Sequence, residues 1–205
     1  MRNLGKILGF LGLILILTGL LLALQFASQV WYTPFVIGGT LFLGYLNDKN
    51  KQGVFNIYRK NKMNFLRIWA VYIITALIIE VLGRYILKLW YYPSFTLTEE
   101  IIHVYLIGYP FALFMTYETY VLIHEKVKEY WEAIIVTTVL SAFLHEIPNT
   151  FAWEWVYTIP RVTREVLGIN VVVIGGWIVL ALLAFTVEHV RRKHRAKSHL
   201  RPHNL

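Results

Sequence analysis

The chain has 205 residues, of which 57% are hydrophobic and 16% are charged, with a formal net charge of +8 and no cysteine. Long apolar stretches in so apolar a composition indicate a polytopic integral membrane protein and exclude an ordinary water-soluble domain. The absence of cysteine excludes disulfides and thiolate metal sites. We expect an all-α fold, because a helix satisfies its own backbone hydrogen bonds in lipid.

Six apolar segments recur along the chain. They are residues 7–26, 34–46, 67–89, 101–123, 133–147 and 167–187. A bilayer core about 30 Å thick needs about 20 apolar residues in a helix. The second and fifth segments are shorter, so we expect them to recruit flanking aromatic residues or to have their ends covered by neighbouring protein. The first follows Arg2 and Lys6, but its apolar run is longer than that of a secretory signal, so we expect it to be retained. Six transmembrane helices are predicted.

Basic residues indicate the orientation. The connection between the second and third segments carries Lys49, Lys51, Arg59, Lys60, Lys62 and Arg67. By the positive-inside rule this connection is cytoplasmic, and counting helices places both termini there as well. We therefore expect a multi-pass bundle over residues 1–190 in the cell membrane and a basic cytoplasmic tail over residues 191–205. The charge of the tail suits anionic lipids and not nucleic acid, while Arg161 and Arg164 on the outer side oppose this orientation.

The outer connections are rich in aromatic residues, which favour the headgroup level of a bilayer. They contain Trp31, Tyr32, Trp90, Tyr91, Tyr92, Trp153, Trp155 and Tyr157. Two similar strings follow, FVIGGTLFLGYL from Phe35 and VVIGGWIVLALL from Val172, with YLIGYPFALFM from Tyr105 as a middle copy. Aligning them brings Glu80 close to Glu146 in register. We predict three tandem helical hairpins of one orientation; the alternative is that small and aromatic residues recur in any membrane helix.

Two pairs of adjacent glycines stand in these strings, Gly38 with Gly39 and Gly175 with Gly176. Small residues let membrane helices approach closely, in the absence of water that would drive association. We predict that both pairs lie at helix–helix contacts.

Ionisable residues at membrane depth cost a few kcal/mol or more, so they are the first candidates for function. Glu80 lies near the middle of the third segment, with Arg84 four residues later, a spacing that allows an ion pair. The pair is either a structural salt bridge or a carboxyl group whose protonation is used. Glu118, in the fourth segment, would complete a proton path with Glu80.

The fourth segment opens with TLTEEIIH. Thr98 resembles a helix N-cap, and Glu99 and Glu100 suit a first helical turn through the helix dipole. Neither argument explains His103, which shares a face with Glu99 or Glu100.

The fifth segment leads into HEIPN and is predicted to stop near Pro148. His145 and Glu146 then lie at the outer boundary of the hydrocarbon, level with His103 and the acidic pair. We expect these histidines and carboxylates from three helices to line one outward-facing pocket.

Three kinds of site fit such a pocket. The first is an acid–base site that acts on a lipid or isoprenoid, with Glu80, Glu99, Glu100, His103, His145 and Glu146 as candidate catalytic residues. The second is a zinc or iron site on His103, His145 and carboxylates, although no HExxH or HxxxH motif is present. The third binds a lipid headgroup or small solute without reaction. The metal, any cofactor and the oligomeric state stay open.

The stretch WYYPSFTLTEEIIHVYLIGYPF, residues 90–111, resembles the small membrane-embedded lycopene cyclase domain family. In that family an aromatic loop leads to an acidic pair that is thought to protonate a polyene, which implies this role for Glu99 and Glu100 and a place in carotenoid biosynthesis. The likeness covers about a tenth of the chain. Leu97 stands where the family usually has proline, His103 and Val104 replace aromatic residues, and the second copy offers only Arg164 and Glu165.

The sequence thus favours a membrane protein that binds or acts on an apolar lipid or isoprenoid through an outer-leaflet pocket, with cyclase-like or isomerase-like chemistry. The alternative is a non-enzymatic transporter subunit, sensor or accessory protein.

Overall fold

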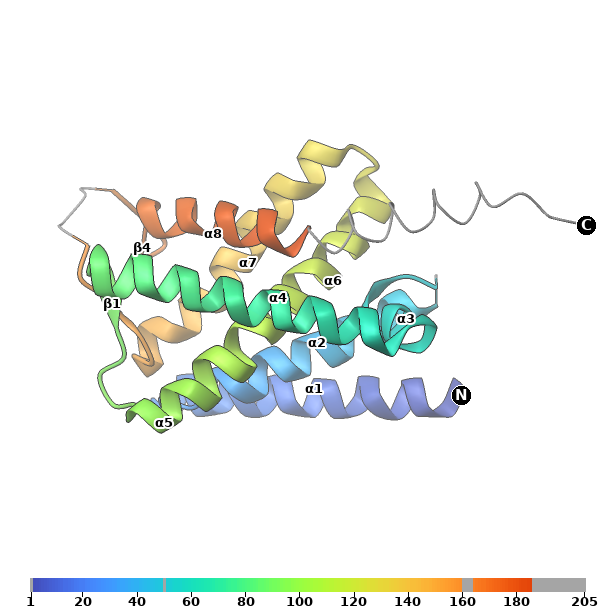
Figure 1. The fold of residues 1–205 in the computed structure, drawn as a ribbon, viewed down its shortest axis with the longest axis horizontal. Coiled ribbons are helices and arrows are strands. Elements are labelled where there is room, and N and C mark those ends of the chain that lie inside the picture. The colour runs from blue at the N-terminus through green and yellow to red at the C-terminus, as the bar shows by residue number, and fades with distance from the viewer. Residues whose placement is uncertain (1, 50, 160–163, 186–205) are drawn as a thin grey trace, which may run out of the picture.

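The computed structural model describes residues 2–49, 51–159 and 164–185, which are mostly helical (Figure 1). The helices are α1 Arg2–Leu24, α2 Tyr32–Asp48, α3 Gly53–Lys60, α4 Lys62–Glu80, α5 Leu97–Glu99, α6 Tyr109–Val127, α7 Tyr130–Ala152 and α8 Val171–Ala184. Two π-helical segments accompany them, η1 Val81–Ile86 after α4 and η2 Glu100–Gly108 between α5 and α6. Each of the six predicted apolar segments overlaps a helix, although residues 169–170 of the last segment form a short strand. The predicted tail over residues 191–205 lies outside the described residues.

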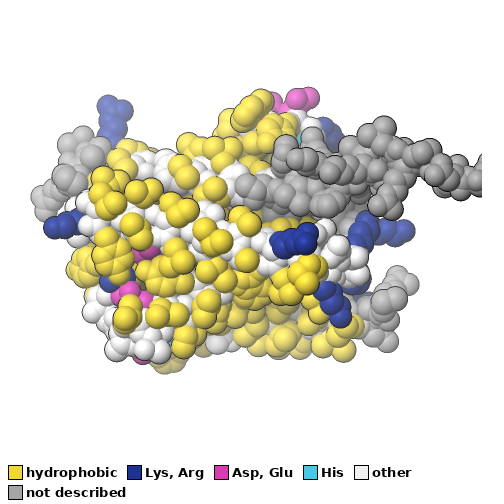
Figure 2. Space-filling view, in the orientation of Figure 1, with side chains coloured by type: hydrophobic (Ala, Val, Ile, Leu, Met, Phe, Trp, Pro, Cys, Tyr) yellow, Lys and Arg dark blue, Asp and Glu magenta, His cyan; other side chains and the backbone are white. Residues whose placement is uncertain are grey.

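Four of these helices are long and apolar enough to cross a membrane. They span residues 4–24, 62–86, 97–127 and 130–152. Helix α2 has 17 residues and α8 has 14, fewer than the roughly 20 that a full crossing needs. Large apolar side chains are exposed along the outside, among them Phe10, Ile74 and Ile135. Figure 2 shows them over the middle of one face, with Lys and Arg side chains toward its ends. Both findings are consistent with a membrane protein.

The helices run between two distinct ends of the molecule (Figure 1). The connections 25–31, 87–96 and 153–159 gather at one end, which we call the aromatic end. The start of α1 and helix α3 lie at the other, which we call the basic end because Arg59 and Lys60 close α3 there. Helix α1 lies along α2, and α8 lies on the other side of α4 in this view.

Two short strand pairs depart from the expected all-α fold. Strands β1 Trp90–Tyr91 and β2 Val156–Tyr157 pair antiparallel, with Trp90 opposite Tyr157. Strands β3 Glu165–Val166 and β4 Ile169–Asn170 form the second pair. The first pair matters for the site, because it ties the connection after η1 to the connection after α7.

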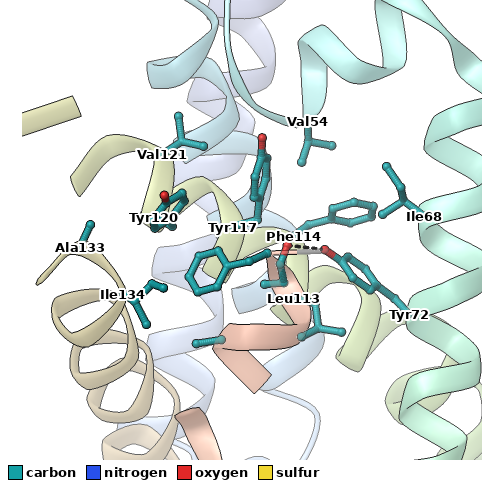
Figure 3. Packing of buried hydrophobic residues seen from close by; sticks show 13 residues of the cluster. Val54, Ile68, Tyr72, Leu113, Phe114, Tyr117, Tyr120, Val121, Ala133 and Ile134 are labelled. Atoms are coloured by element: carbon teal, nitrogen blue, oxygen red, sulfur yellow. Dashed lines mark hydrogen bonds between the residues drawn. The ribbon is translucent and has the colours of Figure 1, made fainter. Parts of the chain in front are cut away.

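Helix α6 occupies the centre of the molecule. Most of its first three turns is buried, and Phe114 and Tyr117 pack there with Tyr72 of α4 and Val54 of α3 (Figure 3). The Tyr72 hydroxyl donates to the carbonyl oxygen of Ala184 at 3.1 Å, which joins α4 to α8. This buried cluster therefore joins α3, α4, α6, α7 and α8, and two further buried clusters lie around Trp31 and Trp177.

Two predicted helix boundaries are wrong. Helix α7 continues through Pro148 to Ala152, and Trp153 ends it in the left-handed region at φ 56°. A proline removes one backbone donor, and neighbouring elements of a helical bundle accommodate that loss. The N-cap of α5 is Thr96 and not Thr98, because the Thr96 side chain accepts from the Glu99 N–H and the Glu99 carboxylate accepts from the Thr96 N–H.

The two glycine pairs behave differently. A Cβ atom on Gly38 would lie 2.6 Å from the carbonyl oxygen of Gly12, and one on Gly39 would collide with Met115 of α6. The predicted close packing is therefore confirmed for this pair. A Cβ atom on Gly175 or Gly176 would meet nothing within 4 Å. The packing prediction is wrong there, since α8 turns these glycines toward open space.

Candidate functional site

A cavity of about 530 Å³ lies between η1, α6, α7 and α8, near the aromatic end. Much of its wall is aliphatic, and Gly175 and Gly176 form part of it. Four tyrosines and three tryptophans also line it: Tyr32, Tyr92, Tyr109, Tyr157, Trp90, Trp155 and Trp177. Among the described residues that line the cavity, Glu146 is the one with an ionisable carboxyl group, and none is Lys, Arg or His.

Glu146 is held by three neutral donors. Its Oε1 accepts from the Tyr157 hydroxyl at 2.8 Å and from Trp177 Nε1 at 2.9 Å. Its Oε2 accepts from Trp155 Nε1 at 3.3 Å. The side chain is buried, so the donors replace the water that a carboxylate would otherwise bind. Glu146 therefore presents a fixed polar group at the wall of an apolar cavity.

Glu80 lies behind the cavity wall and, like Glu146, accepts hydrogen bonds from three neutral donors. Its Oε1 accepts from Trp90 Nε1 at 3.1 Å, the Tyr92 hydroxyl at 2.8 Å and the Tyr109 hydroxyl at 2.9 Å. Its Oε2 is buried and has no hydrogen-bond partner within the described residues. Glu80 does not line the cavity, but Tyr92 and Tyr109 do.

The two glutamates share an order of donors. Glu80 accepts from Trp90, 10 residues later, and from Tyr92, 12 residues later. Glu146 accepts from Trp155, 9 residues later, and from Tyr157, 11 residues later. The third donor comes from a later helix in each case: Tyr109 of α6 donates to Glu80, and Trp177 of α8 donates to Glu146. This agreement supports the predicted tandem repeat. The signal is present in the sequence as a Trp-x-Tyr string after each glutamate.

The tyrosines that bind the glutamates act as donors. Burial raises the pKa of the Tyr157 hydroxyl, and the neighbouring Glu146 raises it further. Burial likewise raises the pKa of Tyr92. Both hydroxyls therefore keep their protons across the neutral range.

His145 lies behind the cavity wall. Its Nδ1 is 2.7 Å from the Tyr32 hydroxyl, and its ring packs 4.5 Å from that of Trp177. The side chain is fully buried but does not line the cavity, whereas Tyr32 does. His145 is therefore placed to orient Tyr32 and Trp177, and does not reach the cavity itself.

Tyr32 also connects the cavity to a second buried acid. Its backbone N–H donates to Glu154 Oε2 at 3.1 Å. Burial raises the pKa of the Glu154 carboxyl well above its usual value, and the hydrogen bond from Tyr32 opposes that rise in part. The sequence reading passed over Glu154, because it follows a tryptophan in what looked like a surface connection.

His103 lies apart from His145. Its Nδ1 is 2.9 Å from the Thr33 hydroxyl, and its half-buried ring lies against Phe95. The two histidines thus bind adjacent residues of α2 without meeting. The described residues contain no group of three or more His, Cys, Asp or Glu side chains that could hold a metal ion. The metal interpretation therefore has no support in the described part of the chain.

Arg84 pairs with Glu100 and not with Glu80. Its two guanidinium nitrogens lie 2.6 and 2.8 Å from the two carboxylate oxygens, which joins η1 to η2. The predicted Glu80–Arg84 pair assumed α-helical geometry. The wider turn of a π-helix moves residue i+4 away from the face of residue i, and so explains the error.

The remaining acidic candidates have structural contacts. Glu99 is exposed and completes the capping box with Thr96. Glu118, at the basic end, accepts hydrogen bonds from the Asn47 side chain and from the Val54 N–H at the start of α3. Gly53 has φ +78°, and a Cβ atom there would lie 2.7 Å from Glu118 Oε1. Glu118 thus anchors α3, and a proton path to Glu80 stays a prediction.

Comparisons with protein-family models, with curated proteins and with solved structures found no match. The resemblance of residues 90–111 to the lycopene cyclase domain family therefore stays a prediction. The function has to be inferred from the geometry of the site.

Proposed function

We propose that this protein is an integral membrane protein that binds an apolar lipid, such as an isoprenoid, in the cavity beside Glu146. One observation carries the proposal: an aliphatic and aromatic cavity of about 530 Å³ has a single described carboxyl group in its wall. This volume lies within the range of about 300–1,000 Å³ of small-molecule sites, which are mostly apolar with few fixed polar groups.

The proposed topology has six helices crossing the cell membrane as three hairpins, with both termini cytoplasmic. The basic residues of α3 support a cytoplasmic basic end, and the tryptophans and tyrosines of the aromatic end suit the outer headgroup level. The cavity then opens at the depth of the outer leaflet, where a lipid can enter sideways past α8.

In the enzymatic form of this proposal, Glu146 is the acid. Its carboxyl proton is transferred to a carbon of a double bond, which leaves a carboxylate and a carbocation, and the later loss of a proton to the carboxylate completes an isomerisation or cyclisation. Tyr157, Trp155 and Trp177 would stabilise the carboxylate form through their hydrogen bonds.

A non-enzymatic role is the second candidate. Glu80 and Glu146 each collect three donors from the following connection and helix, an arrangement that also fastens the aromatic end together. In this form the cavity holds a lipid for transport, sensing or assembly, and the carboxyl groups fix its shape.

Extraction of the purified protein followed by liquid chromatography and mass spectrometry tests the proposal. The wild type should release an apolar compound in a stoichiometric amount, and its absence would contradict binding. A Glu146→Gln variant distinguishes the two roles. An enzyme deprived of its acid should accumulate a substrate with a different retention time, whereas a binding protein should release the same compound as the wild type.

A further inference from the structure

The carboxyl group and the aromatic ring faces of the cavity wall are of one electrostatic sign. The cavity wall contains the Glu146 carboxyl group and seven aromatic rings, and its described residues include no basic side chain. The face of an aromatic ring carries partial negative charge, so ring faces attract cations. The tyrosine and tryptophan side chains of the wall also carry O–H and N–H groups, but these groups already contact Glu80, Glu146 or His145. An anionic group of a ligand would therefore find few free donors in such a wall.

The rings and the carboxyl group form one continuous group. The rings of Tyr32 and Trp155 have centroids 5.0 Å apart. Trp155, Tyr157 and Trp177 all donate to Glu146, and Trp90 lies opposite Tyr157 in the strand pair. Four of the seven rings, those of Tyr32, Trp155, Tyr157 and Trp177, therefore gather on the side of the Glu146 carboxyl group, while the other three bind Glu80.

When Glu146 is ionised, its charge has no cationic partner among the described residues, whose ion pairs are Arg59–Asp48 and Arg84–Glu100. Its three donors are all uncharged. Arg84 lies over the ring of Tyr92, yet its guanidinium is already bound to Glu100. A buried carboxylate with only neutral donors gains stability from a cation, because burial leaves its charge poorly screened.

We infer that the cavity is selective for a lipophilic monocation, an apolar chain that ends in an ammonium group, which the rings and Glu146 surround. This inference rests on the proposed binding of an apolar molecule and adds the charge of the ligand. A phosphocholine headgroup carries the same ammonium, but its phosphate would lie near Glu146 with no described basic residue to bind it.

Three probes with the same ten-carbon chain test the inference in nanodiscs of neutral lipid. They are decyltrimethylammonium, its uncharged carbon isostere 2,2-dimethyldodecane, and decylphosphocholine. Binding is followed by tryptophan fluorescence against the mole fraction of probe in the bilayer. The ammonium should bind at least tenfold more tightly than the isostere, and decylphosphocholine no more tightly than the isostere.

Glu146→Gln should reduce the preference for the ammonium to less than threefold. The control is Glu132→Gln, which removes a carboxyl group from an exposed position of the same helix and should keep the preference. If Glu146→Gln does not fold, the relative affinities of the wild type for the three probes still test the charge selectivity.

A Gly176→Leu variant separates the inference from the proposed function, since it fills the cavity from a position with free space. If the wild type binds the ammonium and the isostere equally and Gly176→Leu binds neither, the charge selectivity is overturned and the apolar site is kept. No loss of any probe in Gly176→Leu would overturn both. Binding of decylphosphocholine as tight as that of the ammonium would overturn the claim for a monocation and assign the site to a phospholipid headgroup.

Discussion

Glu80 and Glu146 accept hydrogen bonds from the same kinds of donor, yet the space beside them differs. Around Glu80 the π-helix η1 places Gly83 against the ring of Trp90, so that an added Cβ atom would overlap that ring. Around Glu146, α8 presents Gly175 and Gly176 to an open cavity. One pattern of donors thus holds one carboxyl group behind the cavity wall, which we call the sealed half, and one in the wall itself, which we call the open half. This difference is the basis of our proposal that the function resides on the Glu146 side and that Glu80 preserves the architecture.

The largest effect should come from removing the sealed carboxyl group. Glu80→Ala leaves the Trp90, Tyr92 and Tyr109 donors buried without their acceptor, and each such donor costs about 1–3 kcal/mol. We expect a loss of roughly 3–5 kcal/mol, or failure to fold, measured by thermal unfolding in detergent. Glu80→Gln, which keeps an acceptor, is the control and should lose less. An unchanged Tm in Glu80→Ala would contradict the structural role.

The glycines of the two halves give the next largest contrast. Gly83→Ala forces a methyl group into the ring of Trp90 and should cost about 1–3 kcal/mol, as overpacking does. Gly176→Ala meets no atom and should leave stability equal or raise it by up to about 1 kcal/mol, because alanine favours helix. Equal losses of stability in the two variants would break the distinction between a sealed and an open half.

The ion pair that joins the two π-helical segments should have a smaller effect. Arg84→Gln leaves Glu100, which is 5% exposed, without its cation, whereas the 18% exposure of Arg84 lets water screen the pair. We expect a loss of about 1–2 kcal/mol, and adding Glu100→Gln should recover part of it. If the double variant loses as much as the sum of the two single variants, the pair contributes no coupling energy.

The pH dependence of stability tests the contribution of the buried Glu154 carboxyl group. Because burial raises the pKa of Glu154, its contribution to stability is complete below the unfolded-chain pKa of about 4.3 and is lost as pH rises through the folded value. Tm should therefore fall between pH 4 and 8 by more in the wild type than in Glu154→Gln. Parallel curves for the two proteins would show that Glu154 makes no such contribution.

The sequence predicts the helices better than it predicts the site. Long apolar segments determine helices by length and hydropathy, so each of the six overlaps a helix. The Gly38–Gly39 and Gly175–Gly176 pairs stand in nearly the same string, and only the neighbouring helices decide that one packs and the other faces a cavity. Local spacing cannot carry that information.

One donor to each of the two glutamates was equally out of reach of local spacing. Tyr109 and Trp177 lie 29 and 31 residues from the glutamates they bind. Arg84 pairs with Glu100 because η1 is a π-helix and not an α-helix. The spacing of apolar residues in the sequence does not reveal this difference. Of the six candidate catalytic residues, the structure places Glu146 in the cavity wall, Glu80 and His145 behind it, and Glu99, Glu100 and His103 in contacts of their own.

The central claim is that the open half holds an apolar molecule, and native mass spectrometry of the intact protein tests it most directly. The measurement compares the wild type with Gly176→Leu and with Ile178→Leu, an exposed position on the same helix that does not line the cavity. The account predicts one bound apolar molecule on the wild type and on Ile178→Leu, and none on Gly176→Leu. A wild type without a bound molecule, or a Gly176→Leu variant that carries the same one, would contradict it.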